Sequence, residues 1–296
     1  MKPKLSLIIP ARDKNDPKLA DLLQSIDAQD FPKDQMEVLV ITEGTSESAK
    51  AIGIRRARGE VIGILASDNT LEFEWTLSEL YRQALHHGAS HPAYYCVNKE
   101  DDILTRYFAL MGSNDPLAYY MNKHDRSPQF TEDIPRFTNG RTIGDNGFFI
   151  KRSLIENTDL DNYYHIDNAN EASIWHSVPE MFCIRHNTGG NLFKFFSKRY
   201  RYGLEHAFNP NRRWHLVDFR KPKDIARLTW FILCSLTLIH PLLTSLRGFL
   251  KIRDVAWFYH PLVCFATTCT YGVLVFHVML RRMFQSSSVP TAERRA

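Results

Sequence analysis

Strand-like and helix-like patterns alternate at the start of the sequence, and this alternation constrains the fold more than any other feature. Apolar runs typical of buried strands cover residues 5–9, 36–42 and 60–66. Between them, one helical face runs through residues 19–26 and a second helix is expected over residues 49–58. Strands that alternate with helices in this way predict an α/β fold with a parallel, doubly wound sheet.

Polar loops follow the three expected strands, at residues 10–13, 42–45 and 67–69. Ligands in such sheets bind beyond the carboxyl ends of the strands, so these loops are expected to converge on one crevice. Asp68, in the last loop, is placed to hold a divalent metal and a diphosphate, because hard cations prefer oxygen ligands. Asp is also a common turn former, so a purely structural role for Asp68 is the alternative.

The segments LSLIIPARD, VLVITEGTSES and GIRRARGEVIGILASDN, in this order and spacing, resemble the family-2 glycosyltransferases of the GT-A fold. The resemblance covers roughly residues 5–203. It implies a nucleotide-diphospho-sugar transferase domain with a Rossmann-like mixed sheet, in which Asp68 binds the metal and the diphosphate. The residues that it implies for nucleoside binding are Pro10, Ala11, Asp13 and Glu43.

The sequence departs from the family pattern at two motifs. TEGT at residues 42–45 replaces the family's DDGS turn, and the DxD motif is reduced to Ala66-Ser67-Asp68. The resemblance implies a divalent metal, Mg²⁺ or Mn²⁺, as cofactor. The loss of the first carboxylate leaves the metal requirement of this chain open.

Inverting sugar transfer needs a general base to take the proton of the acceptor hydroxyl, and a carboxylate suffices. By resemblance this base is Asp167, about twenty residues after the acceptor-side segment TIGDNGFFIKR. Glu171 is the rival base, and an N-cap of a helix is the structural alternative for Asp167. Asn146 and Gly147, within the segment, are expected on the diphosphate or acceptor side, with a simple hairpin turn as the alternative.

Two further groups of residues are expected beside the leaving diphosphate. His186 follows the apolar strand MFCI, where the resemblance implies a histidine that reaches the metal or diphosphate, although a lone histidine is more often structural. Lys198, Arg199 and Arg201 lie in LFKFFSKRYRY and could stabilise the developing negative charge, with solvation at a membrane face as the alternative. The QxxRW pattern of processive relatives is absent, which argues against processive polymerisation.

Two uncharged apolar runs dominate the C-terminal third. Residues 228–246 and 255–280 contain no Asp, Glu, Lys or Arg, and they approach or exceed the roughly 20 residues that span a bilayer. They predict C-terminal transmembrane or membrane-embedded helices. A half-inserted hairpin is the alternative, because Pro241 and Pro261 interrupt the runs and cations occupy the connector. These cations are Arg247, Lys251 and Arg253.

The chain is therefore expected to contain four parts. These are a GT-A domain at residues 1–208, a basic interfacial linker at 209–227, two membrane helices or a hairpin at 228–282, and a disordered tail at 283–296. Five cysteines without CxxC spacing suggest neither zinc nor a disulfide framework, which favours a reducing compartment. We expect an inner (cytoplasmic) membrane protein whose catalytic domain faces the cytoplasm.

These features predict an inverting glycosyltransferase that moves a hexose-type sugar from a nucleoside diphosphate, UDP favoured over GDP, to a lipid-linked or cell-surface glycan acceptor. The alternative is a catalytically degenerate, nucleotide-sugar-binding membrane scaffold. Membrane lipids are expected partners and nucleic acid is not, because the net charge of +4 is mild and its basic residues flank the apolar runs. The absence of G-x-G-x-x-G and P-loop motifs argues against a dinucleotide-dependent oxidoreductase.

Overall fold

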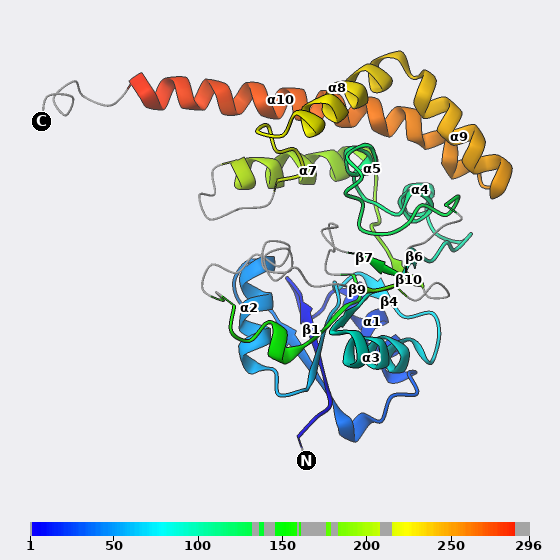
Figure 1. Cartoon of the computed structure of the whole chain (residues 1–296), viewed down its shortest axis with the longest axis vertical. Helices are drawn as coiled ribbons and strands as arrows, with labels where there is room; N and C mark the ends of the chain where they lie inside the picture. Colours follow the sequence, from blue (N-terminus) through cyan, green and yellow to red (C-terminus); the bar gives the residue numbers. More distant parts are fainter. Residues whose placement is uncertain are drawn as a thin grey trace, which may run out of the picture.

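The computed structural model describes residues 2–131, 136–138, 146–158, 160, 176–178, 183–207 and 215–287. Two units stack along the long axis of the molecule (Figure 1). One is an α/β unit that contains the N-terminus, and the other is a group of helices that includes the C-terminal ones. The mixed α/β class expected from the sequence is confirmed for the first unit.

The main sheet of the α/β unit has seven strands in the order β2-β1-β3-β8-β5-β9-β7. Its first half is parallel, because β1 pairs in parallel with β2 and β3, but β8 pairs antiparallel with both β3 and β5. The sheet is therefore mixed, as the family resemblance implies, and not purely parallel. The strands are β1 Leu5–Pro10, β2 Met36–Ile41, β3 Val61–Ile64, β5 Ala89–Ser90, β7 Phe137–Thr138, β8 Phe148–Lys151 and β9 His176–Ser177.

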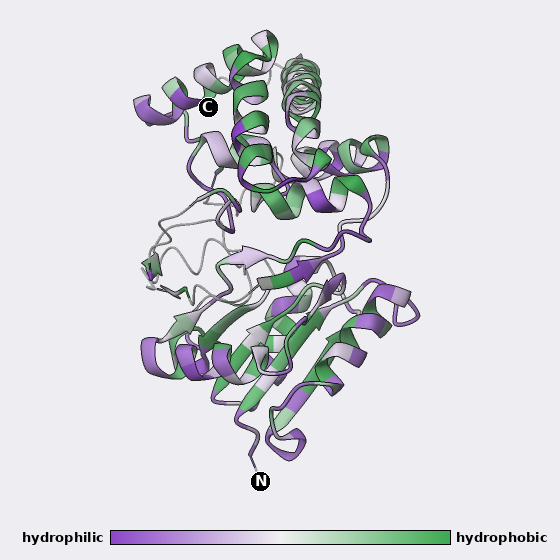
Figure 2. Ribbon diagram, turned by 90° about the vertical axis from the view of Figure 1, so that its right-hand side faces the viewer, coloured by the Kyte–Doolittle hydropathy of each residue, from purple (hydrophilic) through white to green (hydrophobic). Residues whose placement is uncertain are grey.

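Helices cover both faces of this sheet because alternate strand residues point to opposite sides. Leu7 of β1 joins one core cluster with α1 (Pro17–Asp27) and α3 (Thr76–His87). Ile8 points the other way and joins a second cluster with α2 (Ser46–Arg56). Figure 2 shows the apolar interior of this layered unit, with the hydrophilic stretches of its helices on the outside.

A second, three-stranded sheet lies at the end of the α/β unit that faces the helical unit. Its central strand, β10 (Cys183–His186), pairs antiparallel with β4 (Asn69–Thr70) and parallel with β6 (Tyr94–Tyr95). The register places His186 opposite Asn69. Next to this sheet, Cys96 is disulfide-bonded, although the number and spacing of the cysteines suggested no disulfide framework.

The helical unit collects segments from the middle and the end of the chain. Tyr107 and Phe108 of α4 join one cluster with Trp257 of η3, whereas Leu117 of α5 joins another with Phe231 of α8. These helices are α4 Ile103–Met111, α5 Pro116–Tyr120, α7 Leu192–Ala207, α8 Pro222–Thr237, α9 Ile239–Lys251 and α10 His260–Ser287. Short 3-10 turns are η1 Lys33–Gln35, η2 Arg152–Leu154 and η3 Val255–Tyr259.

The two apolar runs fold differently from two straight helices. The first is divided into α8 and α9, which are bent by 83° at Leu238, a residue with a positive φ of 61°. Pro241 and Pro261 lie in the first turns of α9 and α10, where a missing backbone N–H leaves no helical hydrogen bond unmade. By length and composition alone, Val255–Arg281 could cross a membrane, and the bent pair α8–α9 would count as a second span.

Candidate functional site

Asp68 and His186, both predicted from the sequence as site residues, meet beyond the carboxyl end of β3. The carboxylate Oδ1 of Asp68 lies 3.3 Å from Nε2 of His186. The two side chains approach each other because β4 pairs with β10. The pairing is extended by one more backbone hydrogen bond, in which the Asn187 N–H donates to the Asp68 carbonyl at 2.8 Å. A carboxylate and an imidazole, far apart in sequence, are thereby held at one point of the surface.

Cations from two helices surround this pair. Lys18, in the first turn of α1, donates from Nζ to the Asn187 carbonyl at 2.7 Å. Burial would raise the pKa of Asp68, but the His186 ring and the charges of Lys198 and Lys18 outweigh it and lower that pKa to about 2. Asp68 is therefore ionised at every physiological pH.

Lys198 reaches the site from α7, the helix that lies over this end of the sheet. Burial lowers its pKa, the charge of Asp68 partly opposes that shift, and the nearby Arg199, Arg12 and Arg201 lower it further. Arg12, in the loop after β1, donates to the Tyr202 hydroxyl of α7 at 3.0 Å. The loop after β1 and α7 thus bring positive charge to the edge of the sheet where an anion would bind.

A buried chain of hydrogen bonds holds the turn that carries Asp68. Asn69 accepts from the Ala66 N–H at 2.9 Å and donates to the side-chain oxygen of Asn146 at 2.9 Å. Asn146 donates in turn to the Tyr95 hydroxyl at 2.7 Å, and that hydroxyl donates to Asp125. Burial and the charge of Asp125 raise the pKa of Tyr95, so its hydroxyl stays protonated and continues to donate.

His186 is oriented from three sides. The Tyr95 ring lies with its centroid 5.4 Å from that of His186, and Asn114 Nδ2 lies 3.3 Å from His186 Nδ1. Asp68 is then the neighbour of the other ring nitrogen, Nε2. The ring is thereby fixed in position beside Asp68, as expected for a group that contacts a metal or an anion.

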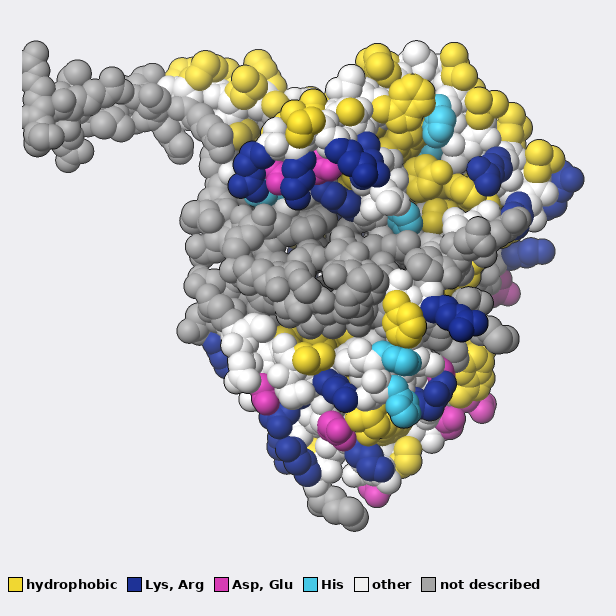
Figure 3. All heavy atoms as spheres, viewed as in Figure 1, with side chains coloured by type: hydrophobic (Ala, Val, Ile, Leu, Met, Phe, Trp, Pro, Cys, Tyr) yellow, Lys and Arg dark blue, Asp and Glu magenta, His cyan; other side chains and the backbone are white. Residues whose placement is uncertain are grey.

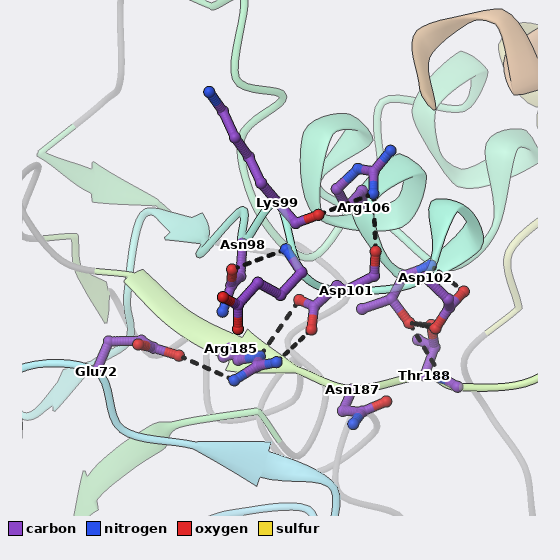
Figure 4. A network of polar contacts seen from close by, with 12 residues as sticks. Glu72, Asn98, Lys99, Asp101, Asp102, Arg106, Arg185, Asn187 and Thr188 are labelled. Atoms are coloured by element: carbon purple, nitrogen blue, oxygen red, sulfur yellow. Dashed lines mark hydrogen bonds and ion pairs between the residues drawn. The ribbon is translucent and has the colours of Figure 1, made fainter. Parts of the chain in front are cut away.

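An ion-pair network anchors the strand that carries His186 (Figure 4). Arg185, the preceding residue, forms a close ion pair with Asp101 and lies 3.8 Å from Glu72. Arg106 of α4 donates to the Asp101 carbonyl at 2.8 Å and pairs with Asp254 at 3.1 Å. The network joins β10 to α4 and to the start of η3, so the site is tied to the helical unit.

The remaining predicted donor residues lie at the same edge of the sheet but have other immediate partners. Ala11 N–H bonds the Ile41 carbonyl at 2.9 Å, directly after Pro10 ends β1. Asp13 accepts from the Asn15 N–H at 2.9 Å in a local turn, and Glu43 forms an exposed ion pair with Arg56 at 2.9 Å. Their roles in nucleoside binding remain predictions.

The other predicted residues divide into three cases. Asn146 is buried, and its side chain is engaged by Asn69 and Tyr95. Gly147, which has a φ of +77°, bonds the Ile64 carbonyl at 3.0 Å, so both residues shape the backbone beside the site. Arg199 and Arg201 lie over the rings of Phe195 and Tyr202, at 5.2 and 5.8 Å. Asp167 and its rival Glu171 lie outside the described residues.

Sequence reasoning did not identify Lys18, Arg12, Asn69, Asn114 or Tyr95 as site residues. A signal existed for Lys18, because Asp16 caps α1 and Pro17 opens it, which puts Lys18 in the first turn after a ligand-binding loop. Asn114 and Tyr95 have no such signal, since only the tertiary fold brings them to His186.

Comparison with known proteins gives structural similarity alone. No family model and no characterised protein sequence matches the chain. S. aureus TarS matches at 15% identity and a TM-score of 0.42, over 71% of this chain and 40% of TarS. Residues 1–349 of TarS with UDP-GlcNAc match at 15% identity and a TM-score of 0.44, over 92% of this chain and 90% of that one.

A mannosyltransferase, PcManGT from Pyrobaculum calidifontis in complex with GDP-Man and Mn²⁺, matches at 15% identity with a TM-score of 0.44. The match covers 91% of this chain and 87% of that one. With TM-scores below 0.5, these similarities transfer neither substrate nor activity to this protein. The function is argued below from the residues of this chain.

Proposed function

We propose that this protein is an inverting glycosyltransferase that transfers a hexose-type sugar from a nucleoside diphosphate, UDP favoured, to a lipid-linked or cell-surface glycan. One observation carries the proposal: the ionised Asp68 lies in the turn after the inner strand β3, among His186, Lys18 and Lys198. A carboxylate surrounded by cations suits the recognition of a diphosphate that is bound to a metal ion or fully ionised.

The transfer would proceed by one displacement. The oxygen of an acceptor hydroxyl forms a bond to the anomeric carbon while the bond from that carbon to the diphosphate oxygen breaks. The hydroxyl proton passes to a general base, for which Asp167 remains the candidate. The leaving diphosphate would gain negative charge, and Lys198 and Lys18, whose charges act on Asp68, would stabilise it.

A divalent metal fits the residues present. Among the described residues no group of three His, Cys, Asp or Glu side chains is arranged to hold a metal ion. Mg²⁺ usually takes one or two protein carboxylates and completes its shell with substrate phosphates and water, and Asp68 with His186 could supply the protein share. When bound, Mg²⁺ or Mn²⁺ would neutralise charge on the diphosphate.

A lipid-linked acceptor and a cytoplasmic-membrane location are proposed because the C-terminal helices expose large apolar side chains. Trp230, Leu243 and Phe276 are each more than half exposed. Such side chains, gathered on three helices, suit contact with lipid. The basic linker beside them favours the cytoplasmic face, where anionic lipids and positively charged loops are found.

The test is isothermal titration of the detergent-solubilised protein with UDP, GDP and their sugars, with Mn²⁺ or Mg²⁺ present and then chelated. We expect one nucleotide to bind, and Asp68→Asn to weaken that binding by about 10- to 100-fold, as for the loss of a charged hydrogen-bonding group. Asp34→Asn, on an exposed acid of η1, is the matched control. No binding of any nucleotide would favour the degenerate scaffold.

Catalysis is tested separately from binding. Asp167→Asn should abolish transfer while donor affinity stays nearly unchanged, because a general base acts mainly in the transition state. Full activity of this variant would remove Asp167 from its proposed role. NMR of the first-formed product reports the anomeric configuration, and retention would exclude the single-displacement mechanism.

A further inference from the structure

Helix α9 buries its small and polar residues and exposes its large apolar ones. In α9, the buried side consists of Pro241, Thr244, Ser245 and Gly248. Ser245 donates to the Trp257 carbonyl at 2.8 Å, so this buried hydroxyl is satisfied inside the protein. The outward side carries Ile239, Leu242, Leu243, Leu246 and Leu250.

Large apolar side chains are exposed on the neighbouring helices as well, although Phe231 of α8 and Val263 of α10 are buried. Trp230 and Leu233 of α8 are each 53% exposed, and Phe276 and Met279 of α10 are 63% and 59% exposed. Figure 3 shows apolar side chains along the edge of the molecule formed by α8, α9 and α10. We call this surface the apolar face. A surface of this kind is unfavourable in water, because each exposed leucine-sized side chain forgoes about 2 kcal/mol of transfer free energy.

Charge around the apolar face is cationic. Arg220, Lys221 and Lys223 precede α8 or lie in its first turn and are exposed, and the connector after α9 adds further cations. Every carboxylate in residues 215–287 forms an ion pair with a cation of the protein. These acids are Asp218, Asp224 and Asp254, and their partners are Arg220, Lys123 and Arg106. Cations that flank an apolar face complement an anionic lipid surface.

Contacts with α7 decide how α10 can meet lipid. The Tyr200 hydroxyl of α7 bonds the His277 ring of α10, and a Cβ on Gly203 would come within 2.3 Å of Leu274, so the two helices pack closely side by side. Figure 1 shows α10 running across the long axis of the molecule, beside α7. α7 carries the exposed Lys194 and the site residue Lys198. If α10 crossed the bilayer, this cationic helix and the edge of the site would enter the hydrocarbon core.

The lengths of α8 and α9 point the same way. They contain 16 and 13 residues and are bent by 83°. At 1.5 Å per residue they are about 24 and 20 Å long, so neither alone crosses a hydrocarbon core of about 30 Å. We propose that α8, α9 and α10 lie in the plane of an anionic membrane, with the apolar face immersed in one leaflet and no helix crossing it. This inference does not depend on the proposed catalysis.

The in-plane arrangement makes a topological prediction that both spanning arrangements contradict. Arg253 and Arg281 lie at opposite ends of the segment that is long enough to cross a membrane. In the plane, both ends lie on the side of the α/β unit. If α10 spans, alone or together with the bent pair, the two ends lie on opposite sides.

Single-cysteine reporters test this with a membrane-impermeant maleimide on sealed membrane vesicles of both orientations. Arg253→Cys and Arg281→Cys are compared with Asp34→Cys, which marks the α/β unit, in a Cys269→Ser background that removes the exposed native thiol. We expect all three to be labelled from the same side. Labelling of Arg253→Cys and Arg281→Cys from opposite sides would overturn the proposal, and the background variant alone should remain unlabelled.

Vesicle flotation tests the lipid partner with the full chain. Binding to phosphatidylglycerol vesicles should exceed binding to phosphatidylcholine vesicles. It should fall by about fivefold for each cation removed from the flank of the apolar face, for example in Lys223→Gln. Leu243→Glu with Leu246→Glu should reduce binding at least about tenfold, whereas Ala20→Glu on α1 should not. If the protein forms a dimer in the absence of detergent and this dimer does not bind the vesicles, a second copy covers the apolar face and the proposal fails.

Discussion

Helix α1 of the α/β unit and helix α9 of the C-terminal region bury opposite kinds of side chain. In α1 the buried residues are mainly apolar, with Leu19, Leu22 and Ile26 packed on the sheet. In α9 they are small or polar, with Thr244, Ser245 and Gly248 turned inward. The same physical rule, that apolar groups leave water and polar groups keep hydrogen bonds, gives these opposite results when the surrounding solvent is water for α1 and, as we propose, lipid for α9.

The largest expected effect comes from leucine truncation in the two regions. Leu22 is fully buried, so Leu22→Ala should lower the free energy of unfolding by about 2–5 kcal/mol. Leu243 is 59% exposed, so Leu243→Ala should change it by no more than about 0.5 kcal/mol in detergent. Denaturant titrations of both variants measure the contrast. Equal losses would mean that protein, and not detergent or lipid, covers α9.

A pair of glycines sharpens the same comparison within the C-terminal helices. A Cβ on Gly248 would lie 2.4 Å from the Trp257 ring, so Gly248→Ala should destabilise by about 1–3 kcal/mol through overpacking. Gly272 on α10 has no atom within 4 Å of a Cβ, so Gly272→Ala should be neutral or stabilise by up to about 1 kcal/mol. Thermal unfolding of both variants measures this difference. A larger loss of stability for Gly272→Ala than for Gly248→Ala would contradict the proposed packing.

The smallest effect concerns the charged site at the end of the sheet. The pKa of Asp68 is lowered from 3.8 to about 2 in the folded protein, so the ionised carboxylate stabilises the fold. That contribution, about 1–2 kcal/mol for a partly exposed group, is complete above pH 4 and is lost as the pH falls towards 2. The stability difference between the wild type and Asp68→Asn should therefore shrink from pH 5 to pH 3. A constant difference would mean that His186 and the lysines do not hold this carboxylate.

Much of the α/β unit follows from local patterns. The three expected strands agree with β1, β2 and β3 to within two residues at each end, because the apolar runs at residues 5–9, 36–42 and 60–66 are short and followed by polar loops. The helix expected over residues 49–58 begins three residues earlier, at Ser46, because Thr45 forms a capping box with Ser48. Capping depends on side-chain contacts that apolar periodicity does not report.

The small sheet that forms the site could not be predicted in the same way. β4 and β6 have two residues each and carry Asn, Thr and Tyr, so no alternation marks them. Their pairing with β10 nevertheless brings Asn69 opposite His186 and builds the hydrogen-bonded turn around Asp68. The sequence identified Asp68 and His186 singly, as residues after strands, but not Tyr95 or Asn114 beside them.

The sequence by itself determined the first three strands, the helices between them and where charge is absent, because these properties depend on neighbouring residues along the chain. Only the tertiary structure decided that Asp68, His186, Lys18 and Lys198 share one site, since those contacts join distant segments. It also decided which side of α9 faces outward, because the hydropathy of a run is the same whichever way the helix is turned. Packing against Trp257 fixes that rotation.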